Sequence, residues 1–162
     1  MNVAGTLGRL TLTSDLSNAA IAAGGIGAVT VTGDLTGSKI LAGCDLGADL
    51  IFGTDDDGVF AGAKGNIGFV TVGGRMSRTS IAANVAPGPN GLFGTTGDVV
   101  LSATLEGAIR SLIVRGTLTG SDDPSEHFGI VAHKTLGFVS VGRSRLALPC
   151  HVGNVTLAGN IG

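Results

Sequence analysis

The side chains best suited to chemistry form an acidic cluster in the first third of the chain. It consists of Asp45, Asp49, Asp55, Asp56 and Asp57. Clustered carboxylates on a glycine-rich loop suit Ca²⁺, which takes roughly 6–8 oxygen ligands. No Glu closes the run as in an EF-hand, and 41 positions later Thr96 and Gly97 replace two of the aspartates. The cluster therefore has two interpretations, a Ca²⁺ site and a solvated acidic loop.

A second group of potential ligands lies near the C-terminal end of the sequence. It consists of His127, His133, Cys150 and His151. Their spacing matches no zinc-finger pattern, so we expect each to have its own local role. The other cysteine is Cys44, and the two form neither a CxxC motif nor a disulfide framework. We expect two small, partly buried thiols.

Carboxylates at equivalent positions of a repeat offer the only catalytic arrangement. Asp15 and Asp34 are 19 positions apart, and Arg75 occupies the next equivalent position. Neighbouring strands lie about 4.8 Å apart, so we expect an Asp34–Arg75 ion pair at the surface. A retaining glycosidase holds its two carboxyls at a comparable distance. The chain has neither Trp nor Tyr to stack on a sugar ring, so we predict no enzyme.

An internal repeat must position these residues. The segment Ile26–Gly33 returns 41 positions later as Ile67–Gly74, and 14 of 34 positions from Ile26 onward are identical to their partners. A shorter copy begins at Leu7, 19 positions before Ile26. The same pattern opens three further segments, Ile109–Val114, Leu136–Val141 and Val152–Leu157. A fixed period of this size indicates stacked units of supersecondary structure.

Alternation within each copy indicates a strand with one inward face. Val29 and Val31 would point inward and Thr30 outward. Stacking would then align one inner column, Leu10, Val29, Val70, Leu112, Val139 and Val155. A second inner column would follow, Leu12, Val31, Val72, Val114, Val141 and Leu157. We predict an all-β fold, a single-stranded right-handed parallel β-helix (solenoid) of about six coils of about 19 residues.

Loop insertions interrupt the predicted coils. They span about 45–66, 87–108 and 121–128, and all are rich in Gly, Asp or Pro. The first two share Phe-Gly-Thr followed by an aspartate, Asp57 or Asp98. We expect side loops on a single domain that covers residues 1–162.

Composition excludes several classes of protein. The 162 residues include 29 Gly without a three-residue period, which excludes collagen. A hydrophobic content of 43% argues against disorder. The net charge of −2 gives no basic footprint for nucleic acid. The start of the sequence has no signal-peptide pattern, and the most apolar stretch, 18–31, is too short to span a membrane.

The ends of the sequence carry no evident cap for a stack of strands. Residues 159–162 repeat residues 65–68, which open a fresh copy of the repeat. Uncovered strand edges invite pairing. We therefore expect the chain to stack end to end with identical subunits or adjoining repeats, forming filaments if the contact does not close.

The repeat resembles the tandem repeats of very large bacterial surface or secreted proteins. The resemblance rests on the pattern opened by Ile26, on Leu92–Thr95 and on His127–Ala132, and it covers Leu7 to Val141. It implies an extracellular, adhesin-like scaffold without catalytic residues. We predict a non-catalytic structural module, and the alternative is an extracellular β-helix that binds or degrades carbohydrate. Two close carboxylates in an open groove would favour that alternative.

Overall fold

The computed structural model describes residues 1–123, 125–152 and 154–159. These residues form strands, turns and bends and contain no helix. Apolar β-branched residues alternate with Thr, Ser and Gly along the strands, which suits a pleated surface with one buried face. The prediction of an all-β protein is confirmed.

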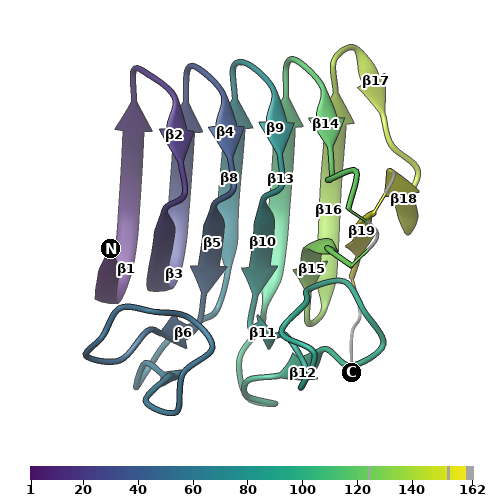
Figure 1. Cartoon of the computed structure of the whole chain (residues 1–162). Coiled ribbons are helices and arrows are strands. Elements are labelled where there is room, and N and C mark those ends of the chain that lie inside the picture. Colours follow the sequence, from purple (N-terminus) through teal and green to yellow (C-terminus); the bar gives the residue numbers. More distant parts are fainter. Residues whose placement is uncertain (124, 153, 160–162) are drawn as a thin grey trace.

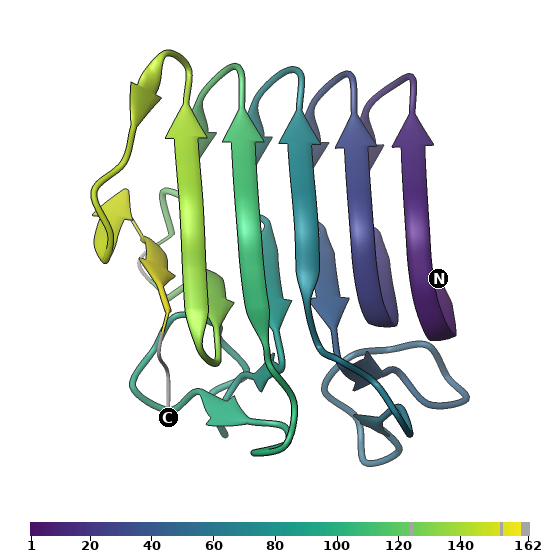
Figure 2. The same ribbon diagram turned by 180° about the vertical axis from the view of Figure 1, so that it is seen from behind.

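Two walls of parallel strands face each other across the core (Figures 1 and 2). Wall A contains β1 (Asn2–Leu12) from Thr6 onward, the second half of β3 (Ala20–Val31), β8 (Ile67–Val72), β13 (Ala108–Val114) and β16 (Thr135–Val141). The first residues of β1, Asn2 and Val3, pair with the first half of β3. Wall B contains the first half of β3, β5 (Lys39–Ala42), β10 (Ser80–Ala83), β15 (Phe128–Ala132) and β19 (Val155–Ala158).

A third, narrower sheet joins the walls at one edge. It contains β2 (Leu16–Ser17), β4 (Leu35–Thr36), β9 (Met76–Ser77) and β14 (Leu118–Thr119). Each of these strands begins four positions after the end of a wall A strand. Leu35, for example, follows Val31, the last residue of β3, by four positions. These short turns line the upper edge in Figure 1.

Strand β3 connects the two walls without a break. Its 12 residues pair first with β5 in wall B and then with β8 in wall A. The strand changes partner at Gly24 and Gly25, which lie between the residues that pair with β5 and those that pair with β8. A Cβ on Gly24 would lie 3.1 Å from the carbonyl oxygen of Gly5, which favours glycine there. The walls therefore belong to one curled sheet of 11 strands.

The predicted single-stranded parallel β-helix is wrong. The strands form a mixed sheet that is curled like half of a barrel, and it contains antiparallel as well as parallel pairs. Strand β16 pairs antiparallel with β17 (Ser144–Arg145), and β19 pairs antiparallel with β18 (Cys150–Val152). The chain reverses after β16 at Gly142, whose φ of 58° suits a turn, and so it leaves the parallel order.

The first inner column shows where the prediction fails. Leu10, Val29, Val70, Leu112 and Val139 are register partners on consecutive strands of wall A. The sixth predicted member, Val155, instead pairs with Phe128 and Val152. Sixteen positions separate Val139 from Val155, fewer than the 19 that separate the closest true partners in this column. The segment is too short for another circuit and turns back.

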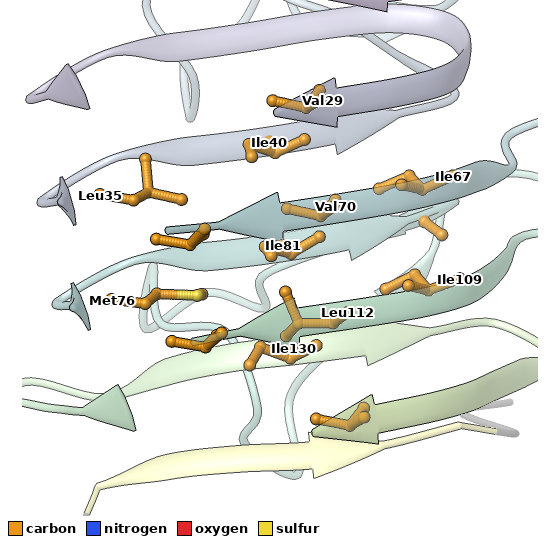
Figure 3. Packing of buried hydrophobic residues seen from close by; sticks show 14 of the residues in the cluster. Val29, Leu35, Ile40, Ile67, Val70, Met76, Ile81, Ile109, Leu112 and Ile130 are labelled. Atoms are coloured by element: carbon orange, nitrogen blue, oxygen red, sulfur yellow. The ribbon is translucent and has the colours of Figure 1, made fainter. Parts of the chain in front are cut away.

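The main core fills the space between the walls (Figure 3). Val29 lies against Ile40, Val70 against Ile81, and Leu112 against Ile130. All six are fully buried, and each such side chain contributes about 1.5–3 kcal/mol relative to exposure. This apolar interior fixes which face of every wall strand points outward.

Two side loops leave the lower edge of the walls in Figure 1. The first is closed by β6 (Cys44–Asp45) and β7 (Gly58–Val59), and the second by β11 (Val85–Ala86) and β12 (Val99–Val100). Both are antiparallel pairs. A second cluster of buried residues, which includes Leu41, Leu46, Val85 and Phe93, packs the loops against wall B. Phe52 of the first loop stacks on Phe93 of the second, with ring centroids 5.4 Å apart.

Candidate functional site

The aspartates of the predicted Ca²⁺ site hold the first side loop in shape. Asp45 Oδ1 accepts hydrogen bonds from Asn2 Nδ2 (2.7 Å) and the Gly47 N–H (3.1 Å). Asp56 Oδ2 accepts from the Ala48 N–H (2.7 Å), and its Oδ1 accepts from the Thr54 hydroxyl (2.7 Å). These hydrogen bonds lower the pKa of Asp56, with that from Thr54 contributing most.

One further member of the acidic cluster approaches Asp56: the Thr54 hydroxyl that bonds Asp56 also lies 3.4 Å from Asp49 Oδ1. Asp49 Oδ1 accepts from the Ile51 N–H (2.8 Å), and Asp55 is exposed. Within residues 1–123, 125–152 and 154–159, no three His, Cys, Asp or Glu side chains gather as metal ligands would. The Ca²⁺ site remains a prediction. The arrangement shown is a set of turns closed by carboxylates.

Asp57 and Asp98 have the same role in the two side loops. Asp57 Oδ2 accepts from the Gly53 N–H (2.5 Å), and Asp98 Oδ2 accepts from the Gly94 N–H (2.8 Å). The Oδ1 atom of each is buried and has no hydrogen-bond partner among the residues that the structure describes. Burial raises the pKa of Asp98, because desolvation penalises its charged form. The shared Phe-Gly-Thr motif thus encodes a loop that its own aspartate closes.

The structure brings two of the three histidines together. His127 Nε2 lies 2.8 Å from Thr156 Oγ1, and His151 Nδ1 lies 3.0 Å from the same hydroxyl. His133 lies elsewhere and bonds the buried amide of Asn84 at 2.9 Å. The two imidazoles share this hydroxyl, and Thr156 pairs with residues of β15 and β18 at this end of wall B.

Both cysteines are free thiols, as the sequence predicted. Cys44 lies buried at the base of the first side loop. Burial raises the pKa of its thiol to about 12, and the nearby carboxylates of Asp57 and Asp45 add to the effect. Cys150 is half-buried in β18, and burial raises its pKa too. Neither environment activates a nucleophile.

The predicted ion pair between Asp34 and Arg75 is present at 3.3 Å. It belongs to a repeated turn, in which Asp15 Oδ1 accepts from the Asp34 N–H (2.8 Å) and Asp34 Oδ1 accepts from the Arg75 N–H (2.7 Å). The two aspartates therefore join successive turns of the upper edge. Both ion-pair side chains are largely exposed, so the pair contributes little to stability.

Strand β1 is the longest open edge that the structure shows. In the described part of the chain it pairs with β3 alone. The Leu12 carbonyl accepts from the Thr32 N–H (2.9 Å) and therefore points toward β3. Backbone groups alternate along a strand, so those of Thr11 and Arg9 point toward the open side. Apolar side chains of β1, such as Leu10, are only partly buried against the core.

The opposite end of the walls is covered. Strands β17 and β18 lie along the outer edges of β16 and β19 (Figure 1). Leu146, Leu148, Cys150 and Val152 pack on the end of the core, and Val139 and Leu157 beneath them are fully buried. An uncapped C-terminal end was expected. The expectation is wrong for residues 142–152, and the predicted repeat of 65–68 by 159–162 falls mainly outside the described residues.

A group of side chains that the sequence did not predict lies on the outer face of wall A, whose strands are nearest the viewer in Figure 2. Phe69 and Phe138 are 49% and 36% exposed. The Arg110 guanidinium lies 5.8 Å from the Phe69 ring centroid, and that of Arg145 lies 5.1 Å from the Phe138 centroid. The signal was the phenylalanine at the outward third position of two repeat copies.

Comparisons with protein-family models, with curated proteins and with solved structures found no match to this chain. No helix that is long and apolar enough to cross a membrane occurs among the residues described.

Proposed function

We propose that this chain is a non-catalytic structural module that associates with a second copy of itself through the open edge of β1. Its setting, by the resemblance to repeats of large bacterial surface proteins, is outside the cell. The observation that carries the proposal is the difference between β1 and the interior strands of wall A. Leu10 is half-buried, whereas its register partner Val29 is completely buried.

The exposed edge offers both elements of strand addition. Thr11 and Arg9 present backbone donors and acceptors, and 11 residues give a long ladder. The partly buried side chains Val3, Leu7, Leu10, Leu12 and Leu16 present an apolar layer that a further strand would cover. No Lys, Pro or acidic residue interrupts β1 to discourage pairing.

The covered C-terminal end favours one geometry for this contact. A head-to-tail stack would require an open strand edge there. β17 occupies that edge at Ser140 and Val141 of β16, and β18 occupies it from Val155 to Leu157 of β19. Two copies related by a two-fold axis would instead bring β1 against β1, and they would be antiparallel. Such a contact is closed and yields a dimer of defined mass.

Analytical ultracentrifugation of the full chain over a wide concentration range tests the proposal. We expect a monomer–dimer equilibrium. Thr11→Pro removes an N–H on the open side and should shift the chain to monomer. Thr11→Val keeps that N–H and the strand preference, and should still form the dimer. Monomers at every concentration would refute the proposal, and so would dimers that Thr11→Pro leaves unchanged.

A further inference from the structure

Charge is segregated between wall A and the rest of the molecule. The strands of wall A contain two charged side chains, Arg9 and Arg110, and no Asp or Glu. Arg145 joins them on β17, which pairs with β16. The net charge of the whole chain is nevertheless −2, because the acidic residues lie in the turns and side loops. The outer face of wall A is therefore a basic surface on an acidic protein.

Two phenylalanines flank a short residue on this face. Phe69 of β8, Ser111 of β13 and Phe138 of β16 are register partners on consecutive strands. Since neighbouring strands lie about 4.8 Å apart, the strands that carry the two phenylalanines are about 10 Å apart. Ser111 between them is short and only 8% exposed. The strip of surface over Ser111, between the two phenylalanines, is called the slot below.

Each ring carries an arginine. The distances of 5.8 Å for Arg110 and 5.1 Å for Arg145 are those of cation–π contacts. Over the described ranges of the chain, ion pairs form only at Arg75 and Arg78, so neither guanidinium has a carboxylate partner. Guanidinium groups match carboxylates as paired donors. Both stand beside the slot and are free to bind an anion.

A hollow of about 480 Å³ adjoins the slot. Arg110, Thr135 and Asn66 are among its lining residues, and Gly68 and Gly137 lie on either side of Arg110. A Cβ at Gly68 would lie 2.3 Å from a backbone oxygen, and one at Gly137 would lie 2.5 Å from another. The close approach of the strands thus keeps side chains out of the hollow.

One carboxylate lies at the border of the hollow and already has a partner. Glu106 accepts a hydrogen bond from the amide of Asn66, whose Oδ1 accepts from the Ala108 N–H at 2.9 Å. Glu106 keeps its negative charge in this bond, and within the described residues it forms no ion pair with Arg110, although it precedes Arg110 by four positions. A ligand in the hollow would therefore meet the Arg110 guanidinium, with the Glu106 carboxylate at the border.

We propose that this face of wall A binds an acidic polysaccharide that contains uronic acid units. Arg110 and Arg145 would bind carboxylates of the polymer, and Phe69 and Phe138 would pack against faces of its sugar rings. The site contains the same Phe–Arg pair twice, on strands about 10 Å apart, which suits a chain of repeating rings and charges better than a single small anion. This site is separate from the β1 edge and does not depend on the proposed self-association.

The test is titration calorimetry of the full chain with an oligogalacturonate, with a neutral maltooligosaccharide of equal length as the comparison ligand. We expect binding of the acidic oligomer alone, weakened by added salt. Arg110→Gln and Arg145→Gln should each reduce affinity about tenfold, the scale of a hydrogen bond to a charged group. Phe69→Ser and Phe138→Ser should also weaken binding.

Arg75→Gln is the matched control, because Arg75 lies on the upper-edge turn and is paired with Asp34. It should bind as the wild type does. All substituted side chains are exposed, and urea unfolding of each variant checks that the fold is intact. The proposal is overturned by absence of binding, by equal binding of the neutral oligomer, by equal losses in Arg75→Gln, or by equally tight binding of single-stranded DNA.

Discussion

The two ends of wall A are built from the same strand pattern and are finished differently. At one end β1 pairs with β3 and leaves Leu10 half-buried. At the other, β16 has a short antiparallel neighbour in β17, and Val139 is completely buried. Both residues belong to one register column. Burial in this fold therefore depends on the neighbour that covers a strand in the stack and not on the strand's own sequence.

The two ends show two ways in which such a sheet can end. At one end, two strands of two and three residues, with Leu146 and Leu148 between them, pack on the last layer. Short antiparallel edge strands offer few groups for further pairing. At the other end, β1 is long and keeps one register from Thr6 to Leu12, after a shift between Val3 and Thr6. This longer ladder offers more groups for pairing.

The largest expected effect is on the free energy of unfolding, and it compares the leucines at two positions of this register column. Leu112→Ala should lower the free energy of unfolding by about 2–5 kcal/mol, because Leu112 is fully buried. Leu10→Ala should cost less than half as much, since its side chain is only partly covered. Urea unfolding at low protein concentration measures both. Equal losses would show that β1 is already covered in solution, so that the two ends of wall A would not differ in burial.

The next largest effect on stability is expected at Gly142, in the turn that leads from β16 to β17. Gly142 has a φ of 58°, and a Cβ there would meet only one atom within 4 Å, at 3.8 Å. Gly142→Val should therefore cost about 1–3 kcal/mol through backbone strain and not through a clash. Gly142→Asn should cost less, because Asn adopts this conformation more readily. Thermal melts distinguish the two variants, and identical losses would argue against strain as the cause.

Thiol labelling tests whether the covered end of the walls opens separately from the rest of the fold. Cys150 lies in the cover and is half-buried, whereas Cys44 is buried with a pKa of about 12. At mildly alkaline pH a thiol reagent should modify Cys150 faster, by at least about tenfold. Low urea should accelerate labelling of Cys150 first, because the cover consists of short strands. Cys150→Ser and Cys44→Ser assign each rate by mass spectrometry, and simultaneous labelling would contradict a separately opening cover.

The smallest effect is the pH response of the second side loop, which neither end should influence. Burial raises the pKa of Asp98 above its unfolded value, so this group favours folding below the unfolded pKa. That contribution is lost as the pH rises through the folded pKa. Asp98→Asn keeps an acceptor for the Gly94 N–H and should melt slightly higher than wild type at pH 7. The difference should disappear toward pH 3, and a difference of constant size would exclude this cause.

Much of the strand register could be predicted from the sequence. Alternation around Val29 and the 41-residue offset identified partners that the structure places side by side, such as Val29 and Val70. The offset works because inward residues must meet inward residues once one face is buried. It could not predict the curl through β3, where the strand passes at Gly24 and Gly25 from its pairing with β5 to its pairing with β8. Nor did a repeat pattern reveal that the segment before Val155 is too short for a circuit.

The hydrogen-bond partners at the candidate site could not be predicted from residue types. Asp45 and Asp56 had two interpretations, as Ca²⁺ ligands or as part of a solvated acidic loop. The Ca²⁺ site stays a prediction, and the structure adds that their oxygens accept hydrogen bonds from Asn2, Gly47, Ala48 and Thr54. The ion pair of Asp34 was predictable, since equivalent repeat positions become neighbours. Phe69 and Phe138 were not recognised, because an outward phenylalanine looks like any strand residue until its neighbours are known.

The upper and lower edges of the walls differ in the length of the connections between strands. The upper turns advance by four positions each time, and Asp15 and Asp34 each bond to the next turn in the stack. The lower edge carries loops of about 20 residues that close on their own aspartates. New peptide segments could therefore be grafted between Asp45 and Gly58, or between Ala86 and Val99, without altering the spacing that aligns the walls. Both loops lie on the same edge of the walls, so the fold offers two neighbouring positions at which added peptides could be presented.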